Sequence, residues 1–167
     1  MTMLVNVIVE LIQLIIAIVL AVVSLYAGFF AFTRIVKGID VPSELKQGNI
    51  AIGVFVASVF IGISVTVVSS IRGVLVGLNN IFADGALNLN DTLDVLSSCM
   101  ELILGILLAI GSIYLAIYVF SRLNNHTDLI RTIKNGNIAI ACTVSGMILA
   151  VSVIIHYGVI GIVTALF

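Results

Sequence analysis

The chain has 167 residues, of which 62% are hydrophobic and only 9% are charged, and its formal net charge is -1. Soluble domains usually carry about 25% charged residues, so this composition is typical of a membrane protein and excludes an ordinary soluble domain. Because the net charge is close to zero, the chain also lacks the excess of basic residues that is typical of nucleic-acid-binding proteins.

Four apolar stretches are long enough to cross a bilayer as helices, because a hydrocarbon core of ~30 Å needs about 20 residues. We expect these spans at about residues 3–32, 50–78, 94–120 and 138–167. The first stretch lacks a basic leader and is too long for a cleaved signal, so we expect it to be retained. Three connections remain, at residues 33–49, 79–93 and 121–137.

Basic residues are confined almost entirely to the first and third connections. The middle connection carries Asp84 and Asp91 but no Lys or Arg. The positive-inside rule therefore predicts that connections 33–49 and 121–137 are cytoplasmic and that both termini lie outside. The basic residues in these two connections are Arg34, Lys37, Lys46, Arg122, Arg131 and Lys134.

The chain contains two copies of one unit, related by an offset of 88 residues. SLYAGFFAFTR (24–34) matches SIYLAIYVFSR (112–122), and ELKQGNIAIG (44–53) matches TIKNGNIAIA (132–141). Over residues 24–53, 11 of 30 positions are identical to their partners, including polar ones that shared apolar composition does not explain. We therefore predict two parallel two-helix repeats, residues 1–88 and 89–167, related by a pseudo-two-fold axis along the membrane normal. The expected fold is an all-α transmembrane four-helix bundle.

The duplicated K-x-G-N-I-A-I motif with its basic connection resembles the DUF350 family, a domain of unknown function. This resemblance implies a small protein of the prokaryotic plasma membrane whose biochemistry is unsettled. It also implies a link to membrane-stress response, because members are often encoded near proteins of that response. The resemblance thus indicates a location and a pathway, and no reaction.

The motif predicts how each basic connection leads into the next helix. Asn49 and Asn137 are favoured N-cap residues, and Gly48 and Gly136 tolerate the unusual backbone angles of a tight turn. Lys46 and Lys134 should lie near anionic lipid headgroups. The alternative is that these turns bind a partner or a ligand, since helix N-termini also bind anions.

Small residues four positions apart recur in the second and fourth spans. Such spacing lets helix backbones approach closely, either within the bundle or between copies of the chain. Together with the short connections, it favours a homo-oligomer. The pairs are Gly53/Ala57, Ser58/Gly62, Ala141/Ser145 and Gly146/Ala150.

Three ionisable residues lie inside the spans, where they are functional candidates by default. At 1.5 Å per residue, Glu10, Arg72 and Glu101 all fall about 9–10 Å from the outer helix ends. At offset 88, Glu10 matches Ser98 and Gln13 matches Glu101, so each repeat carries a polar pair on one helix face. This polar layer predicts either a structural ion pair of Arg72 with one of the acids or a path for ions or protons.

Paired tyrosines, Tyr26 and Tyr114, occupy equivalent positions in the first and third spans. At their depth each hydroxyl should need a protein partner, so we expect hydrogen bonds across the bundle. The alternative is that these hydroxyls line a polar permeation path.

Nothing in the sequence predicts a catalytic, metal or cofactor site. Cys99 and Cys142 should lie near opposite membrane faces, too far apart for a disulfide within one chain. His126 and His156 have no Cys or second His at ligand spacing.

We therefore expect a non-enzymatic scaffold or adaptor whose cytoplasmic basic connections bind a peripheral protein or anionic lipid. The alternatives are a small oligomeric channel or transporter for ions or protons that uses the polar layer and, less favoured, a membrane enzyme.

Overall fold

The computed structural model describes residues 2–36, 38–84, 89–123 and 128–166, and within these ranges it leaves undescribed the side chains of residues 2–6, 35, 69, 80–84, 90–91, 94, 123 and 159–166. Every regular element in the described ranges is a helix. Four of them, α1 (Thr2–Ile35), α3 (Ile50–Asp84), α4 (Leu89–Leu123) and α6 (Ile138–Leu166), are long and apolar enough to cross a membrane. The predicted all-α membrane fold is confirmed.

The basic connections contain two short helices that the sequence analysis treated as loops. They are α2 (Val41–Lys46) and α5 (Leu129–Lys134), each one turn and a half long. The middle connection also differs from the prediction, because α3 continues to Asp84 and α4 begins at Leu89. The candidate membrane spans lie at Ile50–Asn79 and Val95–Arg122, so both helices extend beyond them. The predicted boundary between the repeats, 88/89, falls at the undescribed residues 85–88.

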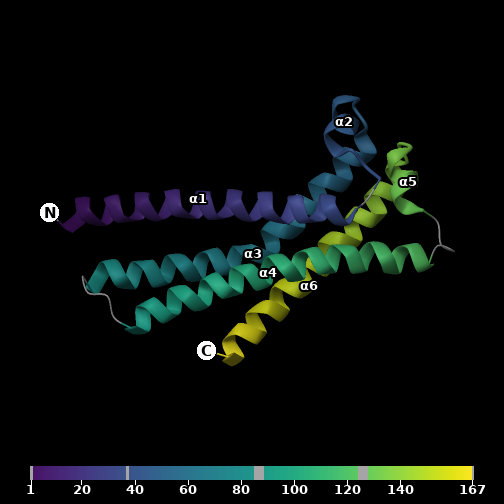
Figure 1. Cartoon of the computed structure of the whole chain (residues 1–167). Coiled ribbons are helices and arrows are strands. Elements are labelled where there is room, and N and C mark those ends of the chain that lie inside the picture. Colours follow the sequence, from purple (N-terminus) through teal and green to yellow (C-terminus); the bar gives the residue numbers. More distant parts are fainter. Residues whose placement is uncertain (1, 37, 85–88, 124–127, 167) are drawn as a thin grey trace.

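Both repeats run through the molecule in the same direction (Figure 1). Helices α1 and α4 run toward the end that carries α2 and α5, and α3 and α6 run back from it. Helix α3 lies at the centre and packs against α1, α4 and α6. This parallel arrangement brings α2 and α5 to one end of the molecule, which we call the elbow end.

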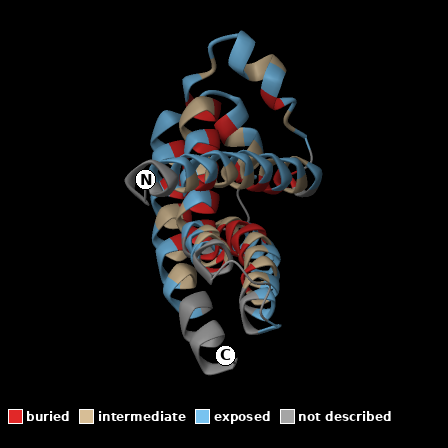
Figure 2. Ribbon diagram, turned by 90° about the vertical axis from the view of Figure 1, so that its left-hand side faces the viewer, coloured by how far each residue is buried: buried red, intermediate tan, exposed pale blue. Residues whose placement is uncertain are grey.

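The core gathers toward the elbow end, where α3 meets α6 and the C-terminal turns of α1. Buried residues lie where helices face one another, and exposed residues lie on the outside (Figure 2). Aromatic contacts join α1 to α3 at the elbow end, with ring centroids 4.9 Å apart for Phe29 and Phe60 and 5.6 Å apart for Phe32 and Phe55. The rest of α1 is peripheral, since only 6% of its most apolar 18-residue stretch is buried, against 56% of the corresponding stretch of α3. Most of α1 is therefore left to contact lipid or another protein chain.

The packing departs from an ideal two-fold arrangement. The α1–α3 contact has its counterpart in the α4–α6 contact, as the repeat requires. The extensive α3–α4 contact, however, has no comparable counterpart between α1 and α6 among the described residues. The bundle is open on that side.

Candidate functional site

Each basic connection folds into an elbow, a short helix followed by a tight turn into the next span. We define the first elbow as residues 40–49 and the second as residues 128–137. The short helices begin at equivalent aspartates: Asp40 Oδ1 accepts a hydrogen bond from the N–H of Ser43 (3.4 Å), and Asp128 Oδ1 accepts one from the N–H of Arg131 (3.1 Å). These N-caps satisfy donors that a one-and-a-half-turn helix leaves unpaired.

The glycines of the motif make the turn at the end of each short helix. Gly48 has φ +75° and Gly136 has φ +85°, in the left-handed region that glycine adopts without a Cβ clash. The N–H of Gly48 donates to the carbonyl of Leu45 (3.0 Å), and the N–H of Gly136 donates to that of Ile133 (2.9 Å). The turn closes the short helix and redirects the chain into the membrane-spanning one.

The asparagines of the motif cap the long helices in both repeats. Asn49 Oδ1 accepts from the N–H of Ile52 (3.3 Å), and Asn137 Oδ1 accepts from the N–H of Ile140 (3.1 Å). Only Asn49 does more: its Nδ2 donates to Glu44 Oε2 (2.9 Å) and to the backbone carbonyl of Lys134 (2.8 Å). The first elbow is thus tied to the second through one side chain.

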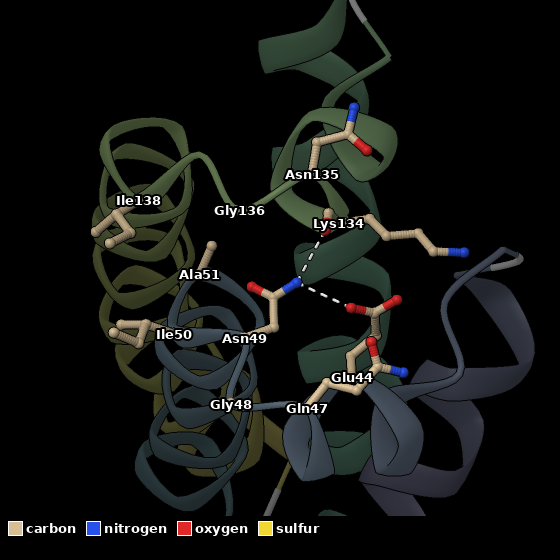
Figure 3. A pocket seen from close by; sticks show the side chains of 10 residues that line it. All are labelled: Glu44, Gln47, Gly48, Asn49, Ile50, Ala51, Lys134, Asn135, Gly136 and Ile138. Atoms are coloured by element: carbon tan, nitrogen blue, oxygen red, sulfur yellow. Dashed lines mark hydrogen bonds between the residues drawn. The ribbon is translucent and has the colours of Figure 1, made fainter.

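Between the elbows lies an open hollow of about 430 Å³, which we call the elbow hollow (Figure 3). Both copies of the motif contribute to its wall, so it is built by the repeat itself. Its lining residues are Glu44, Gln47, Gly48, Asn49, Ile50, Ala51, Lys134, Asn135, Gly136 and Ile138.

The charged groups around the hollow are unevenly placed. The Glu44 carboxylate accepts the Asn49 bond, and the Lys134 ammonium donates to the carbonyl of Gly38 (3.3 Å). Lys46, although equivalent to Lys134, is exposed and does not line the hollow, and Arg131 is also exposed. Asn137 is likewise exposed outside the hollow. Four of the six motif residues named from the sequence therefore meet in one place: Gly48, Asn49, Lys134 and Gly136.

The polar layer is only partly assembled. Gln13 on α1 is buried and its Nε2 donates to Asn79 Oδ1 on α3 (3.2 Å). Glu10 and Arg72 are exposed, and within the described part of the chain no ion pair joins Arg72 to Glu10 or Glu101. The ion pair, one of the two alternatives that the sequence left open, is not formed within the described chain.

Helices α3 and α4 approach closely at the level of this layer. A Cβ placed on Gly73 would lie 2.7 Å from Ser98 Oγ, 3.3 Å from Ser98 Cβ and 3.9 Å from Glu101 Oε2. Ser98 is buried, and the Glu101 side chain is half-buried and has an interaction partner. The acid of the second repeat therefore lies beside the α3 backbone, with little space between the two helices.

The paired tyrosines lie on the outside of the bundle, where the sequence analysis expected hydrogen bonds across it. Tyr26 is 72% exposed and Tyr114 is 55% exposed. Each stacks on the aromatic ring one turn later, with centroids 6.3 Å apart for Tyr26 and Phe30 and 6.5 Å apart for Tyr114 and Tyr118. The expectation of buried hydroxyls was wrong, because helical periodicity alone does not determine which face of an all-apolar helix is covered.

The remaining candidates carry no site chemistry in the described chain. Cys99 is half-buried and Cys142 is exposed, and both are free thiols. His156 Nδ1 is buried without a hydrogen-bond partner, and its ring contacts Tyr157 edge-on. His126 lies outside the described residues. No group of three or more His, Cys, Asp or Glu that could hold a metal ion occurs among the side chains that are described.

The roles of three residues were not predicted from the sequence. The capping role of Asp40 and Asp128 could have been predicted, since the two aspartates are equivalent in the two repeats. Each stands three residues before a backbone N–H that needs a cap in the first turn of a short helix. Asn79, the partner of Gln13, was assigned to the middle connection and not to a span. Only the three-dimensional path of α3 identifies it.

Comparison with known proteins identifies a family. A family model described as Domain of Unknown Function (DUF350) matches residues 3–93 and, a second time, residues 89–167. No curated protein and no solved structure matches the chain.

Proposed function

Because the chain belongs to the DUF350 family, whose description assigns no function, we propose that it is a non-enzymatic membrane scaffold that holds a peripheral protein at its elbow hollow. The observation that carries the proposal is the convergence of both duplicated motifs on this one hollow. A repeat that served only to cap helices would not require its two copies to meet. The Asn49–Lys134 hydrogen bond, which joins them, supports a surface with a fixed shape.

The elbow end faces the cytoplasm in this proposal, and both termini lie outside the plasma membrane of a prokaryote. Five of the basic residues on which the positive-inside argument rests belong to the described chain and stand at or near this end. In addition, Arg34 lies 4.7 Å above the Phe30 ring, which suits an interfacial anchor. The five residues are Arg34, Lys46, Arg122, Arg131 and Lys134.

The charge and shape of the elbows favour an acidic segment as the partner's contact. Lys46 and Arg131 are exposed on the two elbows, whereas the carboxylate that lines the hollow, Glu44, is already bonded to Asn49. Exposed amide side chains of Gln47 and Asn135 add donors and acceptors to the wall. The DUF350 resemblance favours a protein of the membrane-stress response as the owner of that segment.

A binding titration with a defined probe tests this function. The chain is reconstituted in nanodiscs of neutral lipid and titrated with a fluorescent glutamate-rich peptide. We expect binding that weakens as salt screens the charges and that is lost when Lys46, Arg131 and Lys134 are all changed to Gln. The matched control is Arg72→Gln, which removes one exposed positive charge far from the elbows and should leave binding unchanged.

The outcomes separate a protein partner from a lipid one. Binding of the peptide that survives in the triple variant would contradict the proposal. So would absence of peptide binding together with retention of vesicles that contain phosphatidylglycerol, because the elbows would then be a lipid anchor.

One observation favours the second candidate, a small oligomeric channel or transporter for ions or protons. Polar groups from three helices lie close together through the Gln13–Asn79 bond and the Ser98–Gly73 contact. Since Ser98 fills the space against Gly73, we place the path between copies of the chain rather than within one. Proton flux into liposomes that is abolished by Glu10→Gln with Glu101→Gln, with assembly intact, would favour this candidate over the scaffold.

A further inference from the structure

The two repeats bury opposite faces of their equivalent helices, α3 and α6. Six positions in successive turns of α3 are buried, whereas the equivalent six positions of α6 are all exposed. Thr66, for example, is 0% exposed, whereas its equivalent Ile154 is 70% exposed. On α3 the six are Ala51, Phe55, Ser58, Gly62, Thr66 and Ser70. On α6 they are Ala139, Thr143, Gly146, Ala150, Ile154 and Gly158, which we call the open stripe.

The converse holds for the face that α6 turns toward α3. Ser145 and Ser152 are buried on α6, and their equivalents on α3, Ala57 and Ser64, are exposed. With the exposed Ile61 and Val68 they form one side of α3, which we call the α3 outer face. The chain thus exposes a copy of each of the two surfaces that it joins internally.

The internal contact is close and specific. A Cβ on Gly62 would lie 2.6 Å from Ser152 Oγ and 3.3 Å from Ile148 Cγ2, and Ser145 Oγ donates to the carbonyl of Val54 (3.3 Å). Helix α4 completes the contact, since a Cβ on Gly105 would lie 3.6 Å from the carbonyl oxygen of Thr66. Two helices of the second repeat therefore cover the buried α3 stripe at Gly62 and Thr66, while Phe55 also packs against Phe32 of α1.

This contact joins the repeats head to tail. If a two-fold axis related them, the Gly62–Ser152 contact would be accompanied by its image, a contact between Ala150 and Ser64 of the same chain. Both of those residues are exposed. A head-to-tail contact between equivalent units leaves one unsatisfied surface at each end, and such contacts continue into a ring or an open filament.

We propose that a second copy of this chain occupies the open stripe, inserted in the same direction, with its α3 outer face against α6. The first repeat of the added copy then packs against the second repeat of this chain. This contact repeats the one that joins the two repeats within a single chain. The existing α3–α6 interface indicates this occupant. Each chain still exposes the α3 outer face and the open stripe, which are the two surfaces needed to form the same interface again between copies. Small residues in the stripe allow the close backbone approach that such contacts need in lipid.

An independent observation at the elbows agrees with this arrangement. Asn49 Nδ2 donates to the carbonyl of Lys134 across the repeats, whereas the Nδ2 of its equivalent, Asn137, is exposed and has no acceptor among the described residues. In the assembly Asn137 Nδ2 donates a hydrogen bond to the backbone carbonyl of Lys46 in the next copy. A second elbow hollow then forms between the copies, so the scaffold presents docking sites in a row.

Disulfide crosslinking in the membrane tests the proposal through the internal contact and its image. Within the chain, a Cβ at position 62 lies 3.5 Å from Ser152 Cβ, inside the ~3.5–4.5 Å range of disulfides, so Gly62→Cys with Ser152→Cys should crosslink internally. Its image is Ser64→Cys with Ala150→Cys. Both pairs are placed in a background with Cys99→Ser and Cys142→Ser, and membranes are oxidised before denaturing electrophoresis.

We expect the Ser64/Ala150 pair to give dimers, trimers and longer species, and each single variant to give only monomer. When the two substitutions are carried by differently tagged chains, the product should be a dimer of one chain of each kind and nothing longer. Dimers from either single variant would overturn the proposal, because they report a two-fold contact. Monomer alone from the double variant, with the internal pair crosslinking normally, would also overturn it and leave lipid as the occupant of the stripe.

Discussion

The side chain of Asn49 donates a hydrogen bond to the backbone carbonyl of Lys134, 2.8 Å away and 85 residues later in the chain. The two residues belong to different copies of the same motif. This bond makes the equivalent residues Asn49 and Asn137 unequal, since only Asn49 bridges the repeats.

Replacing these asparagines separates capping from bridging. Asn137→Ala removes an N-cap and should lower the free energy of unfolding of the detergent-solubilised monomer by about 1 kcal/mol. Asn49→Ala removes the same cap and the bridge, so a loss of about 2 kcal/mol is expected. Denaturant unfolding followed by circular dichroism provides the comparison, and Asn49→Ser, whose hydroxyl can cap the helix but which lacks the amide donor, should restore only the cap. Equal losses in the two alanine variants would mean that the bridge contributes nothing.

Replacing a turn glycine should destabilise the chain through backbone strain and not through steric clashes of the added side chain. Nothing lies within 4 Å of a Cβ placed on Gly48 or Gly136, but both have positive φ. We therefore expect Gly48→Ala and Gly136→Ala to destabilise the chain similarly, each by about 1 kcal/mol. Gly→Asn at either position should be milder, since Asn tolerates this conformation. A thermal-shift series in one detergent measures all four variants, and alanine variants as stable as the parent would contradict the assigned turn geometry.

The contact of α3 with α4 at Gly73 should be sensitive to an added methyl group. Because a Cβ there would lie 2.7 Å from Ser98 Oγ, Gly73→Ala should destabilise the chain by about 1–3 kcal/mol. The matched control is Gly111→Ala on α4, where nothing lies within 4 Å. That change should be neutral or stabilise the helix by up to about 1 kcal/mol. If both variants unfold at the same denaturant concentration, the close approach at Gly73 is not formed.

The outward position of the tyrosines predicts that their hydroxyl groups add little to the stability of the monomer. Tyr26→Phe and Tyr114→Phe should each change the free energy of unfolding by less than about 0.5 kcal/mol. Phe32→Ala, at a position only 2% exposed in the same aromatic region, should by contrast lower it by about 3–5 kcal/mol. A tyrosine variant that loses stability in detergent would restore the hypothesis of hydrogen bonds across the bundle.

The sequence by itself determined that this protein is an all-α membrane protein with two copies of one unit. Those conclusions rest on properties that are local or repeated along the chain. Apolar stretches of sufficient length must form helices in lipid, because every backbone polar group needs an internal partner there. The tandem match of the family model agrees with the repeat found from G-N-I-A-I and its neighbours. The turn at Gly48 and the cap at Asn49 could also be predicted, since both depend on neighbours only a few residues away.

Only the tertiary structure decided which faces meet. In helices that are apolar all round, hydropathy has no period that marks the buried side, so Tyr26 could not be placed outside nor Gly62 inside from the pattern alone. The same limit hid the Gln13–Asn79 bond and the meeting of the two elbows. The inequality of α3 and α6 went unseen for a further reason: equivalent sequences predict equivalent environments. A head-to-tail contact breaks that equivalence, because the first repeat is covered by the second and the second still exposes the same surface.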